Sequence, residues 1–127
     1  MTYEEFNDFC GSMTATTHII QWGGSDVWKV GGKVFAIGGW ENSEEPAFTF
    51  KASEFDFEVL KDEPGFRLAP YMASRGLKWI QQYQGLKDSD DEIKHYLEES
   101  YSLVSQGLTK KKQKELGLAC LGLPKAN

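Results

Sequence analysis

The sequence has few of the features that mark secreted, membrane-spanning and disulfide-bonded proteins. Its 127 residues include only two cysteines, Cys10 and Cys120, which lie far apart and form no Cys-x-x-Cys pair. This usage is typical of free thiols in a reducing compartment, and a single disulfide closing a long loop is the alternative. No apolar run approaches the roughly 18 residues of a membrane span. The acidic start, Met1–Glu5, lacks the basic and apolar regions of a signal peptide, so we expect a cytoplasmic protein.

Motifs of catalysis and ligand binding are also missing. The two histidines, His18 and His95, belong to no recognised metal-ligand motif, and the acidic stretches have no calcium-loop pattern. The paired glycines form no phosphate-binding loop, and no Gly-x-Ser-x-Gly motif is present. We therefore expect neither an enzyme nor a protein that needs a metal or another cofactor.

Positive charge is scarce and unevenly distributed. The chain has 14 Lys and Arg against 19 Asp and Glu, a net charge of -5, whereas nucleic-acid-binding domains are usually basic. The balance reverses after Gly107, where Lys110, Lys111, Lys112, Lys114 and Lys125 face only Glu115. The run of three lysines is either the basic C-terminal end of a helix, which the helix dipole favours, or a contact for phosphates or a partner.

The strongest local signal in the chain is a β-hairpin from Asp26 to Ile37. Two strand-like runs meet at Gly31-Gly32, and glycine readily adopts the positive φ that a tight two-residue turn requires. This turn would place Trp28 opposite Phe35. The residues then expected to share one buried face are Trp28, Val30, Phe35 and Ile37.

The rest of the pattern predicts a single α+β domain over residues 1–108. A capping box at Thr2–Glu5 opens a first helix, and strands are expected near residues 16–22, 47–51, 66–72 and 77–83. Because successive strands are joined by short turns, we expect an antiparallel sheet of about five to six strands with helices packed on one face. Residues 109–127 form a basic C-terminal extension, which we expect to be partly disordered or helical.

Two further helices follow from apolar spacing. Ser53 can cap a helix from Glu54 to about Asp62, with Phe55, Val59 and Leu60 as its buried stripe. The longest helix follows Ser89 and continues to about Leu108. Its expected buried stripe consists of Ile93, Leu97, Tyr101, Val104 and Leu108.

Several short stretches, taken in order, resemble the MmcQ/YjbR family of small bacterial proteins. The resemblance covers roughly residues 3–115. It is carried by Trp28–Ala36, Phe50–Ala52, Pro64–Phe66, Ala69–Met72, Lys78–Ile80, Ser100–Val104 and the lysines after Leu108. The resemblance implies an α+β fold similar in topology to secretion chaperones, and a DNA-binding role in which two hairpins act as a double wing.

The resemblance also implies where DNA would be contacted. The wings would be the hairpin through Gly31-Gly32 and a second hairpin through Arg75-Gly76. The residues expected to bind nucleic acid are Lys29, Lys33, Arg75, Lys78, Lys110, Lys111 and Lys112. The expected partner is double-stranded DNA, and no membrane is involved. The alternative is a protein- or peptide-binding, chaperone-like module with an acidic surface, whose partner would lie along the sheet or a strand edge.

Overall fold

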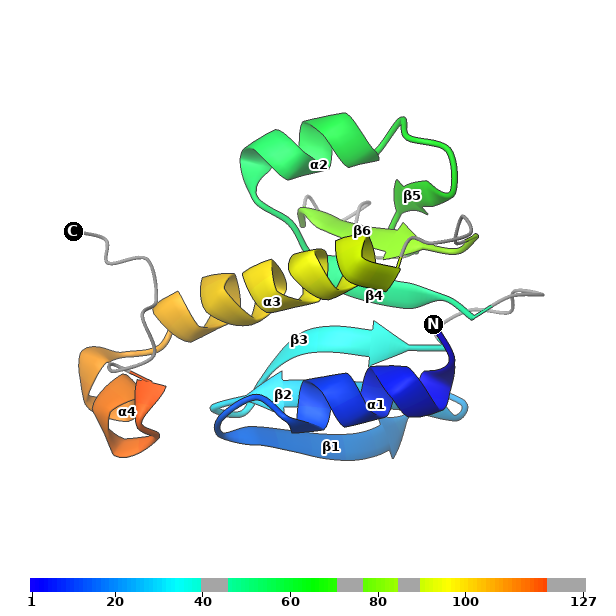
Figure 1. The fold of residues 1–127 in the computed structure, drawn as a ribbon. Helices are drawn as coiled ribbons and strands as arrows, with labels where there is room; N and C mark the ends of the chain where they lie inside the picture. The colour runs from blue at the N-terminus through cyan, green and yellow to red at the C-terminus, as the bar shows by residue number, and fades with distance from the viewer. Residues whose placement is uncertain (40–45, 71–76, 85–89, 119–127) are drawn as a thin grey trace.

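The computed structural model describes residues 1–39, 46–70, 77–84 and 90–118 (Figure 1). The predicted elements are present, although the strands expected near residues 66–72 and 77–83 are shorter. In chain order they are α1 (Tyr3–Gly11), β1 (Thr16–Gln21), β2 (Ser25–Val30), β3 (Lys33–Gly38), β4 (Phe48–Lys51), α2 (Glu54–Leu60), β5 (Phe66–Leu68), β6 (Trp79–Gln82), α3 (Asp90–Gln106) and α4 (Lys110–Glu115).

The six strands form one antiparallel sheet in the order β1-β2-β3-β4-β6-β5. Helices α1 and α3 lie side by side across one face of this sheet (Figure 1). Buried side chains of both helices and of the central strands form a single hydrophobic cluster between the two layers. The predicted α+β fold is therefore confirmed. Among the described residues, no helix is both long enough and apolar enough to cross a membrane.

Helix α1 begins at the predicted capping box. The Thr2 hydroxyl accepts a hydrogen bond from the Glu5 amide at 3.0 Å, and the Thr2 amide donates to the Glu5 carboxylate at 2.9 Å. These hydrogen bonds hold the pKa of the Glu5 carboxyl below its ordinary value. The helix buries Cys10 as a free thiol, whose pKa is raised by burial, and Cys120 lies outside the described residues.

The predicted apolar stripe is correct for α3, whereas in α2 it is correct only at Leu60. All five stripe residues of the long helix are buried. In α2, by contrast, Phe55 is 76% exposed and Val59 is 48% exposed. The seven-residue helix turns Leu60, as predicted, and the half-buried Phe57, three positions before it, toward the core. Four apolar residues in two turns are compatible with either face, so spacing alone did not decide which one is buried.

The β2–β3 hairpin contains a β-bulge that the sequence did not reveal. Val30 pairs with Lys33 and Lys29 with Val34 as predicted, but Trp28 pairs with Ala36, which leaves Phe35 as the extra residue. Because register shifts by one, Phe35 and Ala36 both join the core cluster beneath the helices. Ile37, which was predicted to share that face, pairs with Val27 on the opposite face and is nevertheless fully buried.

A serine of α3 completes the backbone hydrogen bonds at the bulge. The Ser100 hydroxyl donates to the Phe35 carbonyl at 2.6 Å and accepts from the Lys51 amide at 2.9 Å. It thereby bridges β3 and β4 at the position where a direct ladder bond is absent. Ser100 and Phe35 are fully buried, so the Phe35 carbonyl has little access to water as a substitute partner, while Lys51 is half-buried.

We expect Ser100→Ala to lower the free energy of unfolding by about 1–3 kcal/mol, because it leaves the buried Phe35 carbonyl and the Lys51 amide without this partner. Urea titration followed by circular dichroism would measure the change. Ser102→Ala, on the same helix but only half-buried, is the matched control and should change stability by less than about 0.5 kcal/mol. Equal losses for both variants would contradict the bridging role.

Candidate nucleic-acid interface

The topology brings the strands that follow the two predicted wings to the same end of the sheet, where β3 and β6 begin. Strands β3 and β6 are both antiparallel to β4 and are therefore parallel to each other. The first residues of these strands, Lys33 and Trp79, therefore lie at the same end of the sheet (Figure 1). Because one strand separates them, their starting points are roughly 10 Å apart.

The first turn has the predicted primed geometry. Gly31 and Gly32 have φ values of 59° and 84°, respectively. A Cβ atom on Gly31 would lie 2.6 Å from the Leu108 side chain and 3.2 Å from that of Leu116, whereas one on Gly32 would meet nothing within 4 Å. The hairpin tip is therefore packed against the junction between α3 and α4.

Helix α4 is fixed at this end of the molecule by hydrogen bonds to the end of α3. The Gln113 side-chain amide donates to the carbonyls of Ser105 and Leu108, both at 3.0 Å. Thr109 caps α4 by accepting from the Lys112 amide at 3.1 Å. The C-terminal carbonyls of α3 thus gain partners, and the basic helix acquires a defined orientation.

Five of the seven predicted nucleic-acid contacts lie around the first wing and α4. Lys33 is exposed at the start of β3, and Lys110, Lys111 and Lys112 are exposed on α4. Lys29 is half-buried on β2, two residues before the turn, and its pairing with Val34 puts it on the face of the sheet away from α1 and α3. The packing of Gly31 against Leu108 and Leu116 brings the hairpin and helix lysines to one end of the fold.

The second wing offers less free charge. The Lys78 ammonium lies 5.1 Å from the centre of the Phe57 ring, in a cation–π contact. The pKa of Glu58 is lowered mainly by its hydrogen bond to Lys61 and further by the charge of Lys78. Part of the positive potential of Lys78 is therefore offset by this acid. Arg75 lies outside the described residues.

Two lysines at this end were missing from the predicted set. Lys51 is the last residue of β4, between the two wings, and pairs with Trp79. Lys114 is exposed on α4. Lys114 could have been included from the basic run alone, but Lys51 could not, because its place depends on β4 lying between β3 and β6.

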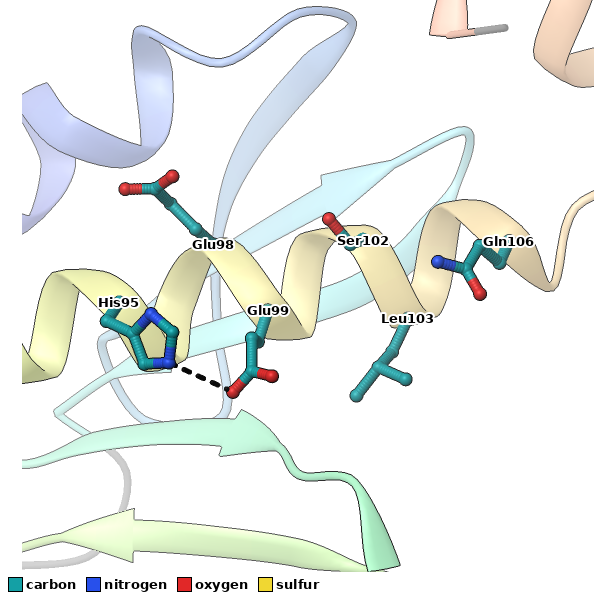
Figure 2. A pocket seen from close by; sticks show the side chains of 6 residues that line it. All are labelled: His95, Glu98, Glu99, Ser102, Leu103 and Gln106. Atoms are coloured by element: carbon teal, nitrogen blue, oxygen red, sulfur yellow. Dashed lines mark ion pairs between the residues drawn. The ribbon is translucent and has the colours of Figure 1, made fainter. Parts of the chain in front are cut away.

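A groove along α3 is a separate candidate site. It has a volume of about 320 Å³ and is lined by His95, Glu98, Glu99, Ser102, Leu103 and Gln106 (Figure 2). The His95 imidazole lies 3.4 Å from the Glu99 carboxylate. Burial and, next, Asp56 raise the pKa of the Glu99 carboxyl, while His95 opposes them. Within the described residues, no hydrogen bond joins Ser102 to His95 or Glu99.

Comparison with known proteins identifies the family. The YjbR family model matches residues 11–103, most of the chain. The chain belongs to the YjbR family. Its fold is similar to the crystal structure of Deinococcus radiodurans protein DR2400, described as a DUF419 domain. The TM-score is 0.78 at 20% identity, and the match covers 92% of this chain and 88% of that one.

A second structure, of a Pseudomonas syringae protein, has a TM-score of 0.63 at 19% identity and covers 81% of this YjbR chain and 98% of its own. At these identities the two likenesses establish the fold. No curated protein matches the chain.

The packing of the wing tip can be tested with two neighbouring glycines. We expect Gly32→Ala to lower the free energy of unfolding by about 1 kcal/mol, because alanine is strained at positive φ. Gly31→Ala should cost about 2–3 kcal/mol, because its methyl group also displaces Leu108. Chemical denaturation of both variants measures the difference, and equal losses would show that the packing against α3 and α4 is unimportant.

The raised pKa of Glu99 predicts a pH-dependent stability. Between the ordinary value of 4.5 and the raised value, the folded chain binds more protons than the unfolded chain, so stability falls as pH rises through this window. We expect Glu99→Gln to have a higher melting temperature than the wild type at neutral pH and the same one below about pH 4. If the two proteins differed in melting temperature by the same amount at both pH values, the raised pKa of Glu99 would be contradicted.

Proposed function

We propose that this YjbR-family chain binds double-stranded DNA through its basic end, without catalysing a reaction or requiring a cofactor. The observation that carries the proposal is the convergence of Lys33 in the first wing with the exposed lysines of α4. Clustered ammonium groups bind the phosphate backbone whatever the base sequence, and the resulting affinity is strongly salt-dependent. The resemblance to double-wing proteins supports the same role.

Part of the negative charge lies far from the lysines of α4 and the first wing, which lessens its effect on the proposal, although the α2 acids Glu54, Asp56 and Glu58 lie nearer to Lys51 and Lys78. The acids of the first turns of α1 and α3 lie at the other end of the fold, where the N-terminal amine is 2.8 Å from the Asp90 carboxylate. The 17-residue helix α3 holds the two ends about 25 Å apart. This exceeds the Debye length of about 8 Å at physiological salt, so the acidic end hardly weakens the field at the lysines.

Fold stability does not account for the lysine run. One interpretation placed Lys110–Lys112 at a helix C-terminus, where the dipole would favour them. Lys110 and Lys111 instead occupy the first turn of α4, where the dipole disfavours positive charge, whereas Lys112 belongs also to its last turn, and all three are exposed. Their concentration at this point therefore supports a role in binding an anionic partner.

We expect the chain to bind a short DNA duplex at about 50 mM salt and to lose affinity steeply as salt rises. Fluorescence anisotropy with a labelled duplex measures both. Replacing Lys110, Lys111 and Lys112 by Gln should reduce the slope of log K against log salt by about 0.9 for each phosphate that the variant no longer neutralises.

Single substitutions give the matched comparison. Lys33→Gln should weaken binding several-fold. Lys94→Gln removes the same charge near the acidic end, where the Lys94 ammonium lies 5.7 Å from the centre of the Phe9 ring, and should have little effect. Failure of the wild type to bind the duplex at low salt, or equal weakening in the two variants, would refute the proposal.

A further inference from the structure

The two edges of the sheet are built differently. At one edge, β5 has only three residues, contains Arg67 and is followed closely by Pro70. Arg67 is held in place by a 2.8 Å hydrogen bond to Gln81 and by stacking over Tyr83. Short length, charge and proline all prevent an edge strand from pairing with another chain.

The other edge, β1, has none of these protections. Its six residues, Thr16–Gln21, include no Lys, Arg, Asp, Glu or proline, and the His18 imidazole lies 2.8 Å from the Asp26 carboxylate of β2. Its pairing with β2 is regular through all six positions, so no bulge twists it away from a neighbour. Its outer side therefore presents a straight row of backbone donors and acceptors, which is a template for another strand.

Exposed apolar side chains accompany this open edge. Ile19 is 43% exposed and Ile20 is 63% exposed, and because neighbouring residues alternate they lie on opposite faces of the sheet. Trp22, directly after the strand, is 51% exposed. Helix α1 covers the inner strands but leaves His18 and Ile20 accessible. Apolar groups gathered along an unprotected edge mark an interaction surface.

We propose that β1 pairs antiparallel with β1 of a second copy of this chain, joining two sheets into one across a two-fold axis. A second copy fits because a two-fold axis makes an antiparallel edge complementary to itself. β1 contains no Lys, Arg, Asp or Glu, so self-pairing sets none of these charges against one another. The proposal does not depend on DNA binding.

Symmetry restricts the register of this pair. The axis stands perpendicular to the joined sheet, so helices of both copies lie on the same face and directly opposed residues must share a face. Placing Ile19 opposite Ile19 of the second copy meets this condition and aligns Thr17 with Gln21 and His18 with Ile20. The arrangement forms a central apolar pair and keeps five residues of each strand in register.

The size of the contact indicates its strength. Two six-residue strands with their flanking side chains would bury on the order of 1,000 Å² in total, at the small end of specific interfaces. The dimer should therefore dissociate in the micromolar range, and its population should depend on protein concentration.

Sedimentation equilibrium of the full chain from micromolar to millimolar concentration tests the proposal. The wild type should shift from monomer to dimer, and Ile20→Lys should remain monomeric because it places a charge at the paired edge. Phe55→Lys, which changes an exposed apolar residue on α2 in the same way, should dimerise like the wild type. A monomeric wild type, or dissociation by Phe55→Lys but not by Ile20→Lys, would overturn the proposal.

Cross-linking tests the register independently of any loss of folding. In a Cys120→Ser background, where the remaining Cys10 is buried, Ile19→Cys should form an intermolecular disulfide under mild oxidation. Thr17→Cys, exposed on the same face but opposite Gln21, should cross-link much more slowly. Equal cross-linking at both positions would contradict the specific pairing and indicate random collision.

Discussion

The arrangement of this fold depends on one hydroxyl group. At the bulge in β3, the backbone of Phe35 is displaced from the regular ladder, and Ser100 from α3 binds it and the Lys51 amide of β4 together. The same contact fixes the long helix over the centre of the sheet, since a buried serine with two backbone partners tolerates little sliding. The bulge keeps Phe35 on the buried face, where its ring packs edge-on against Tyr101 with the ring centres 5.4 Å apart, and moves Ile37 to the opposite face.

Once α3 is fixed, its length separates charge. Its first turn holds acids beside the N-terminus, and its last turn meets the Gly31 hairpin and carries α4. A chain with a negative net charge thereby acquires one basic end, and the distance between the ends exceeds the range of screened electrostatics. DNA binding at that end and strand pairing at β1 would use different parts of the surface, so both could occur in one molecule.

Much of the fold was predictable because it is encoded locally. The Thr2–Glu5 capping box, the glycine turn with two positive φ values and the buried stripe of α3 are each set by residues within a few positions of one another. The errors have equally specific causes. Ile37 changed faces because of a bulge that is completed by a residue 65 positions away. Phe55 and Val59 of α2 stay exposed because the core packs against the side of α2 that carries Phe57 and Leu60.

The candidate nucleic-acid interface was likewise predictable from the sequence only in part. The sequence by itself determined that lysines flank a tight hairpin and cluster after the last long helix, since composition and turn chemistry are local properties. Only the tertiary structure decided that these groups share one end, that Lys51 joins them, and that Lys78 is partly offset by Glu58. Strand order and helix docking set those distances, and they arise from burial and hydrogen bonding between segments far apart in the chain.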